Sequence, residues 1–204
     1  MKRRKPTSKA RVVARAKLPT RFGRFTIAGI RGRGPAEEAV AIQHGRISLK
    51  KAPLVRVHSQ CLTGDVFTSQ RCDCRAQLEF SLRRIAREPS GIVLYLPQEG
   101  RGIGLINKVK AYELQDGGLD TVEANRRLGF AADSRDYDFA AAALKALGVR
   151  SVRLLSNNPD KVQQLEQGGI RVVQLIPCRP PTSHHSRAYL RTKKDKLGHL
   201  LAGV

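Results

Sequence analysis

The sequence has no tryptophan, one methionine and only 17 acidic residues against 38 lysines and arginines. No apolar run approaches the roughly 18 to 20 residues that a membrane-spanning helix needs, so we expect no membrane partner. The first residues are basic, but no apolar segment follows them, so we expect no secretory signal and a cytoplasmic protein. The remaining composition, 41% hydrophobic and 27% charged over 204 residues, is typical of one globular domain.

The shortage of acidic residues is greatest at the N-terminus. Residues 1–34 carry twelve lysines and arginines and no acidic residue, which is more than half of the net charge of +21. Such a segment attracts nucleic acid non-specifically through phosphates, or is a solvated extension without a binding role. We expect residues 1–17 to form a flexible basic arm. The charge by itself assigns no function to it.

The spacing of apolar residues predicts the fold class. Short apolar stretches broken by glycine and proline predict strands over residues 25–30, 40–43, 47–49 and 54–58. Leu78, Leu82 and Ile85 recur with helical spacing and predict a helix that ends before Pro89. Later strands are expected over 92–96, 152–155 and 172–176, and helices after residue 104, over 138–147 and from residue 159. This order predicts an α/β fold with a mixed, partly parallel sheet, a β-rich N-terminal part and flanking helices.

Cysteine is also scarce, but three of the four cysteines, Cys61, Cys72 and Cys74, fall within fourteen residues. Residues two apart in an extended segment point the same way, so Cys72 and Cys74 can face one ion. Three thiolates that leave a coordination position for water are typical of a catalytic zinc site. Two alternatives stay open on spacing alone. Cys178 could complete a structural zinc site, or the three cysteines could be buried as small hydrophobes, although charged neighbours argue against that.

Two further segments could carry chemistry. Residues 99–104, Glu-Gly-Arg-Gly-Ile-Gly, follow an expected strand and precede an expected helix, where backbone amides can approach an anion. They match neither the Walker P-loop nor the dinucleotide fingerprint, so a simple tight turn explains them equally well. Asp133 and Arg135 place a carboxylate beside a guanidinium, which on sequence alone is most simply a surface ion pair.

In combination these segments resemble the GTP cyclohydrolase II family of riboflavin biosynthesis. The motifs that carry the resemblance occur in the family's order over residues 56–65, 71–74, 98–105, 111–112, 120–125, 128–133, 157–159 and 190–201. The resemblance itself runs from about residue 16 to residue 201, nearly the whole chain. Motifs in this order are far more specific than any one of them.

The resemblance implies a reaction. The guanine imidazole ring of GTP is opened by water, formate and pyrophosphate leave, and the product is 2,5-diamino-6-(5-phosphoribosylamino)pyrimidin-4-one, the first step of riboflavin biosynthesis. The resemblance also implies one zinc ion per chain, Mg²⁺ bound with the triphosphate, and a homodimer. It implies a catalytic domain over residues 18–178. The basic arm would precede this domain, and residues 179–204 would follow as a loop and a basic helical tail of the same domain.

The resemblance further implies a role for each matching residue. Zinc would be held by Cys61, Cys72 and Cys74. Asp133 would act as the general base, Arg135 as the nucleophile toward the α-phosphate, and Tyr112 would assist hydrolysis near the metal. The GTP site would be lined by Arg56, Val57, His58, Ser59, Gln60, Gln77, Glu99, Gly100, Arg101, Thr121, Ser156 and Lys161.

Six positions depart from the family's usual pattern. Thr68, Gln70 and Arg75 stand where small or apolar residues are more common. Gln60 stands where glutamate is usual, Pro97 where arginine is usual, and Ser156 where threonine is usual. Gln60 and Pro97 each change a charge near the expected site, so one alternative is a member that stops at a formamide or a triphosphate product. An alternative of another class is a basic nucleic-acid-binding protein with a structural zinc. Phe22 and Phe25 are too few aromatic residues for base stacking in the basic region.

Overall fold

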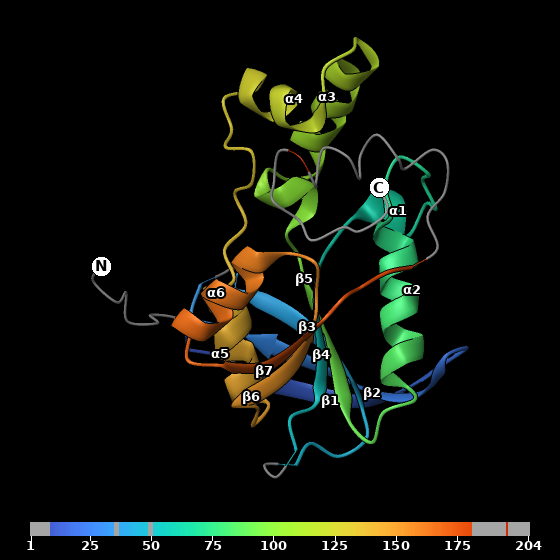
Figure 1. The fold of residues 1–204 in the computed structure, drawn as a ribbon, viewed down its shortest axis with the longest axis vertical. Helices are drawn as coiled ribbons and strands as arrows, with labels where there is room; N and C mark the ends of the chain where they lie inside the picture. The colour runs from blue at the N-terminus through green and yellow to red at the C-terminus, as the bar shows by residue number, and fades with distance from the viewer. Residues whose placement is uncertain (1–8, 35–36, 49–50, 181–194, 196–204) are drawn as a thin grey trace. The chain divides into compact units, whose positions relative to one another are not determined.

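The computed structural model describes residues 9–34, 37–48, 51–180 and 195 (Figure 1). The chain divides into two compact units. Unit 1 comprises Met1–His58, Glu79–Pro97 and Asp136–Cys178, and unit 2 comprises Ser59–Leu78, Gln98–Arg135 and Arg179–Val204. Each unit is built from segments that are far apart in the sequence.

Unit 1 contains the sheet, which has seven strands within the described residues, in the order β1-β2-β3-β5-β4-β6-β7. The strands are β1 (Arg11–Thr20), β2 (Gly23–Arg31), β3 (Glu38–His44), β4 (Leu54–Ser59), β5 (Gly91–Leu96), β6 (Ser151–Leu155) and β7 (Arg171–Ile176). Antiparallel pairing joins β1 to β2, β2 to β3 and β3 to β5, whereas β4, β6 and β7 pair in parallel. The mixed, partly parallel sheet and its strand-rich N-terminal part confirm the predicted fold class.

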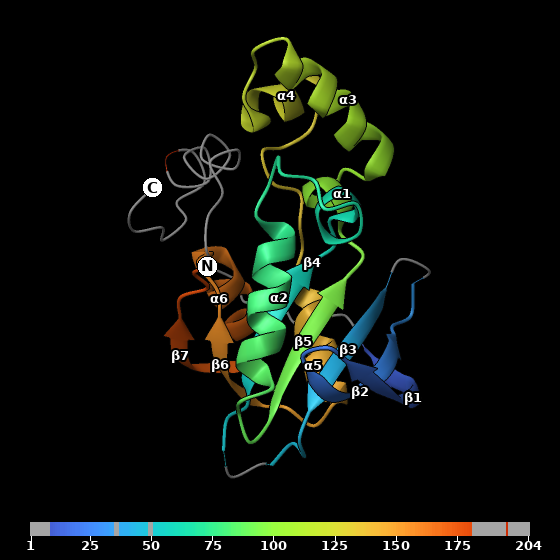
Figure 2. The same cartoon turned by 90° about the vertical axis from the view of Figure 1, so that its right-hand side faces the viewer.

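The helices are α1 (Leu62–Asp65), α2 (Cys74–Ile85), α3 (Leu105–Asp116), α4 (Thr121–Arg127), α5 (Asp138–Ala146) and α6 (Pro159–Gln167), with a short 3₁₀ turn η1 (Glu99–Gly102). In unit 1, the part of α2 from Glu79 lies against one face of the sheet, and α5 and α6 lie against the other (Figures 1 and 2). Both faces of the central strands are therefore covered. A strand covered on both faces reads as a continuous apolar run, as residues 92–96 do.

The core of unit 1 forms where α5 meets the sheet. Ala140, Ala143 and Leu144 of α5 are fully buried, as are Ile92 and Leu94 of β5. Small alanine side chains let the helix approach the sheet closely, and the leucine and isoleucine side chains fill the space between them. This packing fixes the parallel strands whose ends carry part of the predicted site.

The predicted helices and strands are largely confirmed, with two corrections. Residues 46–48 form no strand, so the strand predicted over 47–49 is wrong for its described part. Residues 11–17 of the predicted flexible arm lie in strand β1, where Val12 pairs with Ile30 and Lys17 with Thr26. The strand was missed because most of its side chains are exposed and several are charged, a composition that is normal for an edge strand.

The predicted basic tail lies almost wholly outside the described residues, which after residue 180 include only residue 195. No helix among the described residues has the length and apolar character that a membrane span requires.

Candidate functional site

Three cysteine side chains of unit 2, Cys61, Cys72 and Cys74, form a cluster that we call the cysteine group. Their Sγ atoms all lie within 4.8 Å of one another, and 3.6 Å separates Cys61 from Cys72. A Cβ atom at Gly64 would meet the Cys72 Sγ at 2.9 Å and the Cys61 Sγ at 3.2 Å, so only glycine lets α1 approach the sulfur atoms this closely. Thiolates are preferred ligands of zinc, and the cysteine group can hold such an ion.

The three thiols of the cysteine group alter one another's pKa values. Hydrogen bonds from Cys72 and Cys74, with the positive charge of Lys108, hold the pKa of Cys61 well below its usual range. The hydrogen bond to Cys61 raises the pKa of Cys72 to about 11. The pKa of Cys74 is raised by its hydrogen bonds to Cys61 and Cys72 and by burial. A thiolate flanked by two thiols is ready to bind a metal ion, which would displace the remaining protons.

Lys108 of α3 is buried beside the cysteine group. Its Nζ donates to Cys61 Sγ at 3.1 Å and to Glu99 Oε1 at 2.6 Å. The other oxygen of Glu99 accepts a hydrogen bond from the Leu62 amide at 2.6 Å. Burial by itself would lower the pKa of Lys108, but the hydrogen bond to Glu99 and the charge of Cys61 raise it overall. The sequence interpretation did not include Lys108, because a lysine on a helix is normally solvated.

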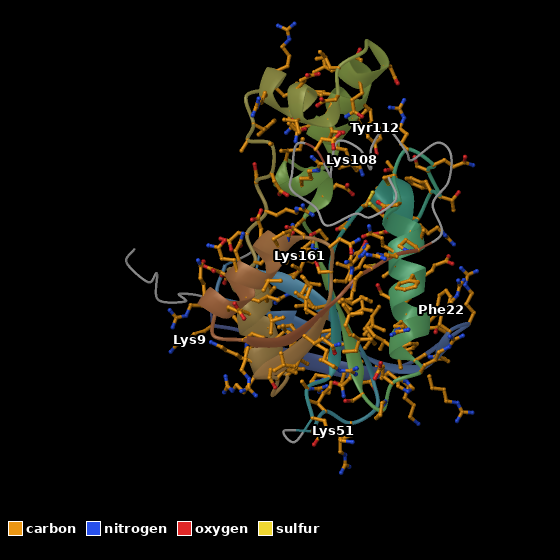
Figure 3. All side chains as sticks on the ribbon, viewed as in Figure 1. Lys9, Phe22, Lys51, Lys108, Tyr112 and Lys161 are labelled. Carbon is orange, nitrogen blue, oxygen red and sulfur yellow. The ribbon has the colours of Figure 1, made fainter. Side chains whose placement is uncertain are left out.

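Tyr112 lies one turn further along α3 (Figure 3). Its hydroxyl is 3.1 Å from Thr63 Oγ1, and its ring centroid is 4.8 Å from the Arg71 guanidinium carbon and 5.6 Å from Lys108 Nζ. Burial raises the pKa of Tyr112, so its hydroxyl stays protonated at neutral pH and can donate a proton. The structure therefore places Tyr112 beside the cysteine group.

The glycine-rich loop turns sharply within η1, just before α3. Gly100 and Arg101 both have a φ of 62°, in the left-handed region. A Cβ atom at Gly102 would meet the Ser134 carbonyl oxygen at 2.9 Å, and the Ser134 amide donates to the Arg101 carbonyl at 3.1 Å. The loop thus packs tightly on the segment that carries Asp133 and Arg135. A non-glycine residue held in the left-handed region, such as Arg101, is a feature found more often at binding sites.

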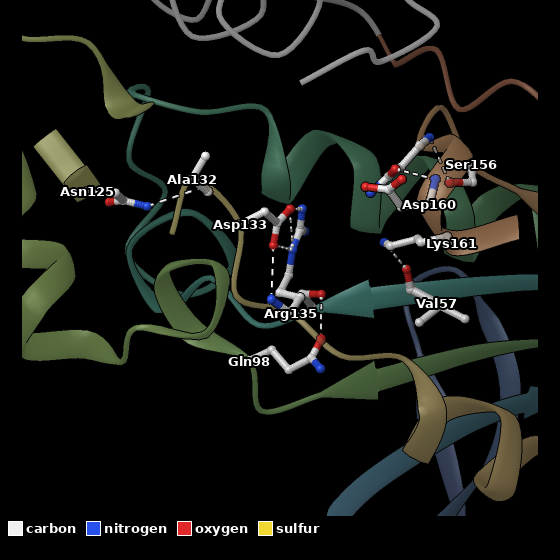
Figure 4. A network of polar contacts seen from close by, with 11 residues as sticks. Val57, Gln98, Asn125, Ala132, Asp133, Arg135, Ser156, Asp160 and Lys161 are labelled. Carbon is white, nitrogen blue, oxygen red and sulfur yellow. Dashed lines mark hydrogen bonds and ion pairs between the residues drawn. The ribbon is translucent and has the colours of Figure 1, made fainter. Parts of the chain in front are cut away.

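Asp133 and Arg135 form a partly buried pair in unit 2, with 23% and 13% of their side chains exposed (Figure 4). Arg135 donates through Nε to both Asp133 oxygens, at 2.8 and 3.1 Å, and through Nη2 to Oδ2. Burial would raise the pKa of Asp133, but the hydrogen bonds and charge of Arg135 hold it below its usual value. The solvated surface pair that sequence alone favoured is therefore not what the structure shows.

Unit 2 contains an open cavity of about 470 Å³ whose walls bring several of these groups together. Its walls include the cysteine group, Lys108, Tyr112 and Arg135. Among the predicted GTP-binding residues, the cavity is lined by Ser59, Gln60, Glu99, Gly100, Arg101 and Thr121. Gln77 is not among the lining residues, and its side-chain amide donates to Asp73 instead.

The other predicted GTP-binding residues lie in unit 1, at the carboxyl ends of β4 and β6 and the start of α6. Lys161 Nζ donates to the Val57 carbonyl at 2.8 Å, and Arg56 Nη1 donates to the Leu155 carbonyl at 3.1 Å. His58 stacks on Tyr95, and the Asn158 amide donates a hydrogen bond to Ser156 Oγ at 3.1 Å. Lys161, Val57 and Ser156 appear in Figure 4. The carboxyl ends of parallel strands are the usual position of ligands in α/β sheets.

Comparison with known proteins gives consistent matches. Residues 10–177 match the sequence model of the GTP cyclohydrolase II family. The chain is 54% identical over 189 residues to GTP cyclohydrolase-2 of Pseudomonas putida, covering 93% of this chain and 92% of that protein. It is 49% identical over 195 residues to a riboflavin biosynthesis protein of Vibrio vulnificus, covering 96% of this chain and 53% of that protein. One solved structure, a two-domain 3,4-dihydroxy-2-butanone 4-phosphate synthase from A. baumannii, is also similar. It has a TM-score of 0.45 and 17% identity, covering 84% of this chain and 40% of that one, and it is too distant to inform the fold or the chemistry.

Proposed function

The chain belongs to the GTP cyclohydrolase II family and has that family's function in riboflavin biosynthesis, and we propose that it acts through a zinc ion held by Cys61, Cys72 and Cys74. The observation that carries the proposal is the convergence of three Sγ atoms within 4.8 Å on the wall of a cavity. A zinc ion with three protein ligands keeps a position for water and lowers the pKa of that water toward about 7.

A residue beside the cysteine group would donate the proton that opening of the guanine ring requires. Ring opening consumes water and leaves a formamide, and a second hydrolysis releases formate. The Tyr112 hydroxyl, held by Thr63, is protonated at neutral pH and would donate a proton to the departing ring nitrogen. Thr63 sets the distance of the Tyr112 hydroxyl from the cysteine group, because Thr63 Oγ1 also lies 3.7 Å from Cys61 Sγ.

Asp133 and Arg135 would act at the α-phosphate. A bond forms between a guanidinium nitrogen of Arg135 and the α-phosphorus, the bond from that phosphorus to the bridging oxygen breaks, and pyrophosphate leaves. Water then cleaves the nitrogen–phosphorus bond. Guanidinium is almost always protonated, so its attack needs a proton acceptor, and Asp133 already accepts hydrogen bonds from both Nε and Nη2. These contacts support Asp133 as the general base.

The phosphates carry most of the negative charge of GTP, and positively charged residues among the predicted GTP-binding set would bind them. These are Arg101 of the glycine-rich loop, Arg56 and Lys161. A Mg²⁺ ion would accompany the triphosphate, as is usual when phosphoryl groups are transferred. Arg56, Lys161 and His58 are each more than nine-tenths buried, so they are held in place before a ligand binds.

We also propose a cytoplasmic homodimer. Ile106, Val109 and Phe67 of unit 2 are 68%, 52% and 68% exposed, and such apolar side chains are typical of surfaces that another chain covers. Equilibrium sedimentation of the full chain tests the dimer.

Product analysis tests the proposed reaction. Purified protein incubated with GTP, zinc and Mg²⁺ should yield formate, pyrophosphate and the diaminopyrimidine ribosyl phosphate, identified by mass. Arg135→Ala should release pyrophosphate far more slowly than the wild type, and Arg135→Lys is the matched variant that keeps the charge without the guanidinium. Normal pyrophosphate release by Arg135→Ala would show that the covalent role is wrong. A formamide or triphosphate product from the wild type would instead point to the early stop that Gln60 and Pro97 suggested.

A further inference from the structure

We propose that Lys108 is a positioning residue for the metal site, whose ammonium group hydrogen-bonds to the Cys61 sulfur and limits how much charge that sulfur donates to the ion. The inference rests on the proposed zinc function, because it concerns a thiolate that binds metal. It adds a residue outside the predicted ligand and GTP-binding sets, and it assigns that residue a role through Cys61.

The ammonium group of Lys108 is held in place by its contacts. Lys108 Nζ lies 3.1 Å from Cys61 Sγ and 2.6 Å from Glu99 Oε1, and each of the two charged residues is only 8% exposed. Lysine and glutamate are almost never this buried unless they are paired. The ammonium group has three donors, and two of them are committed to a sulfur atom and a carboxylate. Lys108 cannot turn to solvent without giving up both contacts.

Glu99 holds the lysine in this place. Its Oε1 accepts from Lys108 and from the Gly100 amide at 3.0 Å, and its Oε2 accepts from the Leu62 amide at 2.6 Å. Leu62 is the first residue of α1 and directly follows Cys61. The carboxylate therefore joins the glycine-rich loop, the lysine and the backbone beside a metal ligand into one hydrogen-bonded unit.

The charges explain why a lysine belongs here. Three thiolates and a divalent ion have a net charge of −1, and Glu99 adds another negative charge close by. One buried ammonium group offsets part of this excess where water cannot. A hydrogen bond donated to a thiolate also draws electron density from the sulfur, which leaves the bound ion a stronger Lewis acid. Groups that hydrogen-bond to metal ligands commonly tune a site in this way.

Helix α3 has one face toward the cysteine group and another face exposed to solvent. Lys108 and Tyr112 are four residues apart and lie on the side of α3 that faces the cysteine group, whereas Ile106, Val109 and Lys110 are exposed. Lys110 thus offers a matched control, since it is a lysine of the same helix outside the cavity wall.

Cobalt(II) substitution of the full chain tests the inference, because the thiolate-to-cobalt charge-transfer band reports electron density at sulfur. In Lys108→Met the band should shift to lower energy, since the sulfur becomes a stronger donor. Lys108→Arg should restore most of the wild-type position, and Lys110→Met should leave the band unchanged. Formate release by the zinc form of Lys108→Met should fall about 10- to 100-fold, the range found for groups that orient metal ligands.

A second variant guards against misfolding. Lys108→Met leaves Glu99 buried without its cation, so Lys108→Met combined with Glu99→Gln removes both charges, and it should show the same band shift. If the wild type gives the band and neither variant shifts it, Lys108 does not act on the metal-bound thiolate and only this inference fails. If the wild type gives no thiolate-to-cobalt band, the zinc function fails and this inference with it.

Discussion

Thr63 Oγ1 lies 3.1 Å from the Tyr112 hydroxyl and 3.7 Å from Cys61 Sγ, so one threonine on α1 connects the tyrosine of α3 to the cysteine group. Its position depends on the sharp entry of the chain into α1, where the Cys61 amide donates to Asp65 Oδ2 at 3.1 Å. The phenol is therefore oriented by a hydroxyl that contacts Cys61, a proposed zinc ligand. Its place in the cavity does not depend on packing alone.

Replacing Thr63 by valine removes this hydroxyl and keeps the side-chain shape. A neutral hydrogen bond contributes about 1 kcal/mol, so formate release should fall roughly fivefold while zinc content stays the same. Thr63→Ser keeps the hydroxyl and should retain most of the activity. Equal rates for Thr63→Val and the wild type would show that the contact does not orient Tyr112.

The pair of Asp133 and Arg135 should make stability depend on pH. The pKa of Asp133 is lowered in the folded protein. The ionised carboxylate therefore stabilises the fold above the ordinary carboxyl pKa of about 3.9, and this stabilisation is lost as the pH falls through the lowered pKa. At neutral pH, Asp133→Asn should lower the free energy of unfolding by about 1 to 3 kcal/mol. In denaturant titrations the difference should shrink as the pH falls below about 4.

Asp116→Asn is the control for this measurement. Asp116 pairs with Arg71, but 64% of its side chain is exposed, and exposed ion pairs contribute little. If the wild type and Asp133→Asn differed in free energy of unfolding by the same amount from neutral to acid pH, the ion pair would not be the source of that difference.

The first strand gives a prediction about truncation. A chain that lacks residues 1–15 loses half of β1, including the pairing of Val12 with Ile30 and the packing of Ala10 and Val12 on the core. We expect a loss of about 2 kcal/mol, which lowers the melting temperature by about 4 to 8 °C for a chain of this size. A chain that starts at Lys9 keeps the whole strand and serves as the control. Identical melting curves for the two truncations would mean that the half-strand contributes nothing.

The sequence predicted those elements in which burial follows a regular period. Leu82 and Ile85 are buried on α2 as their spacing predicted, and the apolar run of β5 is buried throughout its centre. Strand β1 was missed because an edge strand exposes most of its side chains, so its apolar alternation is weak. Helix α4 was also missed, although Asp120 and Glu123 form a capping box that the sequence already displays.

The site was predictable where its chemistry is local in the sequence. Cys72 and Cys74 are two residues apart, and the approach of Cys61 to them is confirmed. Lys108 gave no signal, because the burial of a lysine depends on the carboxylate and the sulfur that long-range folding brings to it. The division between His58 and Ser59, which belong to different units, also could not be read from a continuous motif.

The most direct test of the metal site measures zinc content and formate release together in two cysteine variants. Cys72 belongs to the cysteine group, whereas Cys178 belongs to unit 1, where its backbone amide and carbonyl bond to the Asn157 side chain. Its sulfur takes no part in those bonds, so Cys178→Ser should keep one zinc ion per chain and release formate at the wild-type rate. Cys72→Ser should lose both the zinc and the formate. Full zinc content and normal formate release in Cys72→Ser, or the loss of zinc in Cys178→Ser, would contradict a catalytic site built on Cys61, Cys72 and Cys74.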